Sequence, residues 1–341
     1  MKIILIIFSI SIFSNNLFSK TLFDTTFYNV EFISNNIEND KLAKIKEIKF
    51  DSIKEILIKT LEYENYNKIN QNLSEDLINT FIKNIIVDNE KIINDKYFSK
   101  IKINFNKKKI IKYFRNEKIP YVEYHPKKLL LIIYEKDQVS DNLFTKNNNY
   151  YSHFINNLNS NSLFQIPNLD INDRFILNKK DIEKRNIEKI MNFSKKYNIN
   201  EIIIVQTEKN KNSHIFELAL LSNGEILEKK MLFNKKKLNN FFKILETESL
   251  NIWKKVNQIQ NNLLNVLNCK VSYYNMLELK EIKSNLNNIS LIENLNVKSI
   301  SYRKIEFDIY YYGNLKILSN TLKLNKLKLN NNKNVCTLRL K

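Results

Sequence analysis

Glycine is almost absent from this sequence of 341 residues, which contains only Gly224 and Gly313, far apart in the chain. Glycine-rich phosphate loops, dinucleotide-binding fingerprints and the nucleophile elbow of hydrolases each need two or three glycines within a few residues, because the backbone must turn sharply or approach a ligand. The sequence therefore excludes these enzyme classes. Turns that need a positive φ must use other residues, and we expect the many asparagines to fill part of them.

Histidine and cysteine are also scarce, with three and two residues. These numbers are too small for a cysteine-rich zinc module, a haem-attachment motif or an iron–sulfur ligand set. We therefore expect neither a metal nor a cofactor, and we assign no catalytic residue.

The first residues have the pattern of an export signal. Lys2 precedes a run of eleven apolar and small residues, 3–13, and a small residue, Ser19, follows a short polar stretch. This pattern is typical of a secretory signal peptide, and the run is too short to span a bilayer. We expect residues 1–19 to be removed, leaving a periplasmic or secreted protein without a transmembrane segment.

The chain is strongly basic, with 55 Lys and Arg against 36 Asp and Glu and a net charge of +19. Such a charge favours anionic partners. The lysines are nevertheless spread along the whole sequence and form no single stripe, and an exported chain leaves the compartment that holds the genome. We therefore expect no nucleic-acid partner, whereas an anionic polymer of the cell envelope fits the charge.

The pattern of apolar residues predicts an α+β protein of several modules. In the N-terminal module, residues 20–126, we expect the order β, α, α, β, β, α, β, a split βαβ unit with an extra helix. Its second helix follows Ser74 and carries Ile85, and its last strand lies near Tyr121.

The central module, residues 127–235, is expected to be a small α/β layer. Its apolar segment 129–134 suits a strand covered on both faces, and Ser222–Gly224 suits a hairpin turn between two strands. Asn178, with Asp181 three residues later, predicts a capped helix start. Residues 236–266 are expected to form a connector helix.

The C-terminal module, residues 267–341, shows the order β, α, β, β, α, β, which is the ferredoxin-like pattern. Its first and last strands carry Cys269 and Cys336 on their inward faces. Export and adjacent strands favour a disulfide between them, whereas an antiparallel register offsets the two residues by about three positions, beyond good bridging geometry. The sequence leaves both alternatives open.

Several short motifs resemble a family of exported bacterial proteins catalogued as domain of unknown function 2066. The matching segments span most of the chain after the leader: residues 103–106, Ile119-Pro120, 166–173, Asp181-Ile182, Tyr197, 312–315 and 335–340. The resemblance implies an exported, uncharacterised envelope protein, and the family has no established activity to carry over.

Asp170 and Asp173 are the first choice for a polar binding site, because they follow a proline-containing loop. Together with Asn172 they resemble the start of a calcium loop, but Arg174 and Phe175 stand where such a loop needs an oxygen ligand and a glycine. The alternative is structural: a carboxylate at this place caps a helix or braces a turn.

Tyr121, Glu123 and His125 alternate along one predicted strand, so that a carboxylate and an imidazole on one face are candidates for an acid and a base. The structural alternative is an edge-strand face at a module boundary.

The sequence thus favours a non-enzymatic interaction or scaffold protein of the envelope, bound to an envelope protein or an anionic envelope polymer. Two alternatives remain open: a hydrolase that uses Asp170, Asp173 or Glu123, and a peripheral binder of anionic lipid. The hydrolase needs a pocket that gathers two of these carboxylates, and the lipid binder needs lysines collected on one face.

Overall fold

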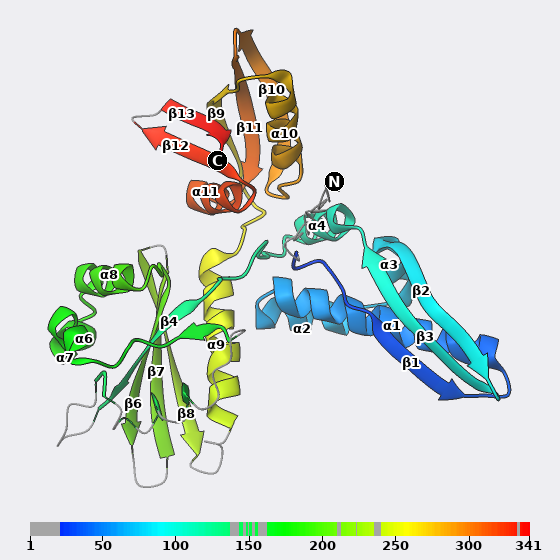
Figure 1. Ribbon diagram of the computed structural model, residues 1–341, viewed down its shortest axis with the longest axis horizontal. Coiled ribbons are helices and arrows are strands. Elements are labelled where there is room, and N and C mark those ends of the chain that lie inside the picture. The colour runs from blue at the N-terminus through cyan, green and yellow to red at the C-terminus, as the bar shows by residue number, and fades with distance from the viewer. Residues whose placement is uncertain are drawn as a thin grey trace, which may run out of the picture.

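The computed structural model contains three β-sheets and confirms the predicted α+β fold of several modules (Figure 1). It describes residues 21–136, 143–145, 148, 150–151, 154–155, 162–209, 213–222, 224–234, 240–332 and 335–341. The predicted export signal, residues 1–19, lies outside the described residues.

The N-terminal module forms an elongated arm (Figure 1). Its elements are β1 (Tyr28–Ile33), α1 (Ile37–Thr60), α2 (Tyr63–Gln71), α3 (Glu75–Phe81), β2 (Ile82–Ile93), β3 (Lys96–Phe105) and α4 (Lys107–Asn116). The antiparallel sheet has the order β1-β3-β2. Alternate residues of β3, including Ile101 and Ile103, are buried in the same core as Ile53 and Ile56 of α1, so one face of the sheet is covered by helix.

Two predictions for this module were wrong. The helix after Ser74 ends at Phe81, and Ile85 lies in β2 instead, because the run Ile85-Ile86-Val87 is β-branched and favours a strand. The expected strand near Tyr121 is absent from the module's sheet. Tyr121 forms only an isolated bridge with Ile259, since the chain leaves the sheet here to reach the other modules.

The central module is a mixed sheet with the order β5-β4-β6-β7-β8. Its elements are β4 (Leu129–Glu135), β5 (Phe164–Gln165), α6 (Ile171–Ile176), α7 (Lys179–Glu183), α8 (Ile187–Lys196), β6 (Ile202–Lys209), β7 (Ser213–Ser222), β8 (Glu225–Asn234) and α9 (Phe241–Asn257). As expected, β4 is buried on both faces: Leu131 and Ile133 contribute to one core and Leu130 and Ile132 to another.

The helix expected to connect modules belongs to the central sheet. Phe241, Leu245, Ile252 and Trp253 of α9 are buried in the same core as Phe216 and Leu218 of β7. The apolar stripe that suggested a contact between modules is therefore used to cover one face of this sheet. The chain then passes from α9 to the C-terminal module through the residues after Asn257.

The C-terminal module has five strands in the order β10-β11-β9-β13-β12. Its elements are β9 (Leu264–Ser272), α10 (Met276–Asn287), β10 (Ile292–Ser301), β11 (Lys304–Tyr312), α11 (Leu315–Leu324), β12 (Leu327–Asn332) and β13 (Val335–Leu340). The sequence predicted only one strand after α11. The additional β12 reverses the chain, so that β13 enters beside β9 in parallel.

Asparagine serves helix starts more than left-handed turns. Ten described non-glycine residues have a positive φ, and only Asn89, Asn94 and Asn198 among them are asparagines. By contrast, asparagine side chains accept a first-turn N–H in six helices, at Asn36, Asn106, Asn178, Asn186, Asn275 and Asn314. Asparagine therefore does replace glycine at some turns, as expected, but more asparagines cap helices.

Candidate functional site

The segment after α4 lies at a junction of the three modules. The Val122 N–H donates to Thr60 O at the end of α1 (2.8 Å), and the Ile259 N–H, after α9, donates to Tyr121 O (2.7 Å). The side-chain amide of Asn261 donates to Ile119 O (2.7 Å). Backbone from each side of the molecule therefore converges on this short segment, which we call the junction (residues 119–125).

Glu123 is the polar centre of the junction, and its side chain is only 7% exposed. Its Oε1 accepts from Lys107 Nζ of α4 (2.6 Å) and from the Ser290 N–H (3.1 Å), and Oε2 accepts from the Ser290 hydroxyl. Nearby, Arg115 of α4 pairs with Glu293 of β10. Because charge-assisted hydrogen bonds are the strong ones, Glu123 links α4 to the loop before β10.

The last carbonyl groups of α1 are capped by side chains from α9 and from the junction. Lys254 of α9, which is buried, donates from Nζ to Ile58 O and to Leu61 O, the latter at 2.9 Å. His125 Nε2 lies 2.6 Å from Lys59 O and donates to it. A cation at a helix C-terminus is favourable, and orphan carbonyls need donors. The arm is thus fixed to the central module through the end of α1.

Burial shifts the pKa of both capping groups. Desolvation lowers the pKa of His125 to about 4, although its bond to Lys59 O opposes that shift, so that the imidazole is neutral at pH 7. Desolvation likewise lowers the pKa of Lys254 to about 8, and Glu62 opposes that shift. Lys254 remains mostly protonated at neutral pH and keeps its donors for the carbonyl groups.

Glu123 and His125 do not act on each other as an acid and a base. Each makes its hydrogen bonds to a different structural element, Glu123 to Lys107 and Ser290, and His125 to α1. The predicted edge strand is instead a connection between modules. Its polar side chains hold the modules together, so the structural alternative is right about the module boundary and wrong about an exposed edge strand.

Asp170 and Asp173 come together at the start of α6, where Asp170 is the N-cap and accepts from the Asp173 N–H (2.9 Å). The Asp173 side chain is 0% exposed and accepts from the Tyr197 hydroxyl (2.7 Å) and from Lys196 Nζ (2.6 Å). These contacts tie α6 to the end of α8. The carboxylates form a helix cap and a brace, not an open oxygen-lined site.

A groove of about 1020 Å³ lies at one end of the C-terminal sheet. It is formed at the end of β9 and the segment before α10 (Ser272, Tyr274), the turn between β10 and β11 (Arg303), the second half of α11 (Lys323) and the β12–β13 pair. None of Asp170, Asp173 and Glu123 lines it.

The charge of this groove is almost entirely positive. The side chains of its lining that are charged at neutral pH are one acid, Glu278, and six cations: Arg303, Lys304, Lys323, Lys328, Arg339 and Lys341. Within the described part of the chain, no salt bridge reaches any of the six. In the arm, Lys41 and Lys96 are paired with Glu90 and Glu31, whereas Lys91 and Lys100 form no salt bridge within the described residues. Lysines without an acidic partner thus occur elsewhere too, but the groove brings six cations and one acid to one end of the C-terminal sheet.

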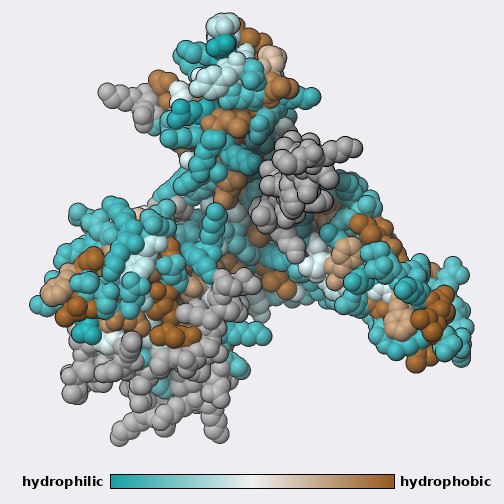
Figure 2. All heavy atoms as spheres, in the orientation of Figure 1, coloured by the Kyte–Doolittle hydropathy of each residue, from teal (hydrophilic) through white to brown (hydrophobic). Residues whose placement is uncertain are grey.

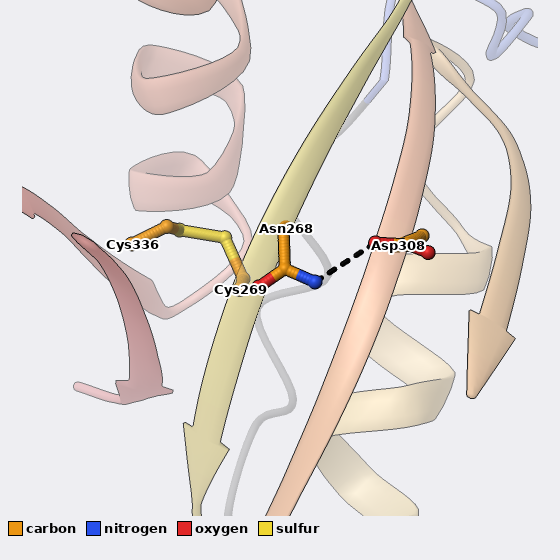
Figure 3. Close-up of a disulfide and its surroundings, with 4 residues drawn as sticks. All are labelled: Asn268, Cys269, Asp308 and Cys336. Atoms are coloured by element: carbon orange, nitrogen blue, oxygen red, sulfur yellow. Dashed lines mark hydrogen bonds between the residues drawn. A yellow bond between two sulfur atoms is a disulfide. The ribbon is translucent and has the colours of Figure 1, made fainter. Parts of the chain in front are cut away.

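A disulfide fixes the strand that carries part of this groove. Cys269 of β9 and Cys336 of β13 are joined, and their Cα atoms lie 4.5 Å apart (Figure 3). The two residues are direct partners in the parallel β9–β13 pair, so the offset expected from an antiparallel register does not arise. On the other face of β9, the Asn268 amide donates to Asp308 of β11 (2.9 Å).

The described residues contain no cluster of three potential metal ligands. In the same part of the chain, every helix is too short or too polar to cross a bilayer.

Comparison with known proteins finds no match among family models or curated proteins. Among solved structures, the C-terminal domain of LpoB from Salmonella enterica is similar at 12% identity over 38% of this chain and 95% of that chain, with a TM-score of 0.23. A score this low carries no argument about fold or function. The resemblance to domain of unknown function 2066 stays a prediction.

Proposed function

We propose that this chain is an exported protein of the cell envelope that acts as a non-enzymatic binding scaffold, as its resemblance to domain of unknown function 2066 implies. The observation that carries the proposal is the junction, where buried and charged groups from all three modules are used to hold the modules together. Glu123, Lys254 and His125 have structural partners. A protein with its modules fixed in this way presents separate surfaces in a set arrangement.

The end of the arm is the surface we assign to a partner protein. β2 is an edge strand of 12 residues, free on one side within the described sheet. Ile92 and Ile93 of β2, and Ile33 at the end of β1 on the opposite edge, lie exposed at the far end of this sheet, where Figure 2 shows a brown apolar patch. An unpaired strand beside apolar side chains is suited to the addition of a strand from another protein.

Site-specific photo-crosslinking in cells tests this assignment. A photoreactive residue at Ile93 should give one adduct of constant mass, identified by mass spectrometry. The same residue at Phe175, an apolar and even more exposed position on α6, should give none. The substitution Ile33→Ser should abolish the adduct. The absence of an adduct at Ile93, or the same adducts at both positions, would contradict the proposal.

Fractionation tests the export part separately. The proposal predicts a product in the periplasm or medium whose N-terminal residue is Lys20, as cleavage after Ser19 requires. A cytosolic product that retains Met1–Ser19 would remove the compartment and the partners inferred from it.

The hydrolase alternative has less support. It requires at least two of Asp170, Asp173 and Glu123 in one pocket. Asp173 is braced by Lys196 and Tyr197, while Glu123 lies in the junction among other partners.

A further inference from the structure

We propose that the groove end of the C-terminal module docks onto the surface of an anionic lipid bilayer. In this arrangement the groove cations bind phosphate groups of the lipid heads, and apolar side chains beside the groove enter the interface. The proposal concerns different residues from the arm, and so it stands or falls independently of the partner protein proposed above.

The cations form a row across neighbouring strands. Lys304 of β11 is the partner of Ser272 of β9, and Lys328 of β12 is the partner of Arg339 of β13. In the parallel β9–β13 pair, Leu338 is the partner of Val271. Extending this register by one position along both strands places Arg339 beside Ser272. Four strands therefore bring three cations together over a width of roughly 14 Å, given the usual spacing of strands.

This row lies on the face of the sheet away from the helices. Lys304, Lys328 and Arg339 are exposed, while their neighbours Ile305, Leu327 and Leu338 are buried. The buried neighbours share a core with Leu279 of α10 and Leu318 of α11. The cations are thus directed to solvent.

The pairing of Lys328 with Arg339 is unfavourable without a ligand. Like charges directly opposite each other in an antiparallel pair destabilise the sheet. No acid among the described residues forms a salt bridge with either of them. An anion between the two side chains would remove this repulsion, and phosphate oxygens match the donors of Arg and Lys.

Large apolar side chains lie exposed at the same end of the module. Tyr302 is 83% exposed and Leu277 80%, and Tyr274, Met276 and Ile300 are nearly as exposed. Tyr274 lines the groove itself, Arg303 of the groove lies over the Tyr302 ring, and the Tyr273 N–H donates to Arg303 O (3.1 Å). The start of α10 and the β10–β11 turn are thus held together.

The combination selects a lipid surface over a soluble polyanion. A polymer in solution would use the cations and leave Leu277 and Tyr302 in water. Aromatic and aliphatic residues beside basic residues are typical of proteins that lie on anionic membranes, where phosphate groups and the apolar boundary are close together. At the end of the arm, by contrast, two of the cations, Lys41 and Lys96, are paired with Glu90 and Glu31.

Vesicle co-sedimentation tests the proposal with the full exported chain. Vesicles of phosphatidylcholine with phosphatidylglycerol should bind the protein, and vesicles of phosphatidylcholine alone should not. The double variant Lys328→Ser, Arg339→Ser should weaken binding roughly thirtyfold. The variant Leu277→Ser, Tyr302→Ser should weaken it by at least about tenfold.

The matched control is Lys100→Ser, Lys316→Ser, which removes the same charge from the arm and from the opposite end of α11. Its binding should change by less than about twofold. Hydrogen exchange should show that all variants keep the protection of β9 and β13.

Two results would overturn the proposal. One is an equal loss of binding in the groove variant and the control, which would show that only net charge matters. The other is tight binding of soluble polyphosphate through Lys328 and Arg339 with no binding to anionic vesicles, which would make a polymer the ligand.

Discussion

The N-terminal and C-terminal modules begin in the same way and complete their folds differently. Each has a strand, helical structure and two further strands, in the sheet orders β1-β3-β2 and β9-β11-β10. The C-terminal module then adds β12 and β13 and a disulfide of its own. The arm adds no strand to its sheet, and the end of α1 is capped by Lys254 and His125. One module is internally crosslinked, and the other depends on contacts outside its sheet.

Removal of the disulfide should have the largest effect and should be confined to the C-terminal module. The double variant Cys269→Ala, Cys336→Ala opens a loop of 67 residues, so the free energy of unfolding of this module should fall by about 4 kcal/mol. Hydrogen exchange measured by mass spectrometry should show lower protection in β9 and β13. An equal loss of protection in the arm would show that the two modules are not stabilised separately.

Substitution of Glu123 should lower protection in the arm and leave the C-terminal module unchanged, the reverse of the disulfide variant. Glu123→Ala removes the acceptor of Lys107 and of Ser290, at a cost of about 3 kcal/mol. We expect protection to fall in α4 and at the end of α1, while β9 and β13 keep theirs. Unchanged exchange throughout the arm would contradict its dependence on the junction.

Acid should loosen the arm before it loosens the C-terminal module. The pKa of His125 is lowered from 6.5 to about 4 in the folded protein, so the unfolded chain binds the proton more readily. This contribution to stability is complete above pH 6.5, and it is lost as the pH falls toward 4. At pH 5 the loss should reach about 2 kcal/mol.

The control for this titration is His125→Gln, which retains a donor for Lys59 O but does not titrate between pH 8 and 5. Chemical denaturation at several pH values should show a flatter dependence for the variant. An identical pH dependence in both proteins would exclude His125 as its source.

Removal of a helix cap in the central module should have the smallest effect, and it should disturb neither the arm nor the C-terminal module. Asp170→Ala removes the acceptor for the Asp173 N–H, which should lower the free energy of unfolding by about 1 kcal/mol. The photo-crosslinked adduct at Ile93 and binding to anionic vesicles should both persist. If a folded Asp170→Ala protein lost either the adduct or the binding to vesicles, the hypothesis of a binding site at Asp170 would be supported again.

The sequence predicts local structure well where one pattern dominates. The alternation in β3 and β11 matches the observed strands, and the N-cap expected at Asn178 is confirmed. The single helix expected to follow it through Ile187 and Ile190 is instead two helices, because α7 ends at Glu183 and Asn186 caps α8. β12 was missed because Asn330-Asn331-Asn332 resembles a turn. The alternation Leu327-Lys328-Leu329 was the available signal for it.

The functional surfaces depend on pairings that one sequence does not show. Lys328 and Arg339 become neighbours only through the β12–β13 hairpin, and Cys336 meets Cys269 only because that hairpin makes β13 parallel to β9. Glu123 looked like a candidate acid until Lys107 and Ser290 were seen to surround it. Short-range patterns carry no information about such long-range contacts.

The central claim is that the junction holds the three modules in one arrangement. Spin labels at Ile93→Cys on the arm and Lys316→Cys on the C-terminal module allow the distance between them to be measured by pulsed electron paramagnetic resonance, since the native cysteines are joined. We expect a single narrow distance distribution that broadens when Glu123→Ala is added. A broad distribution in the protein with an intact junction would contradict the account.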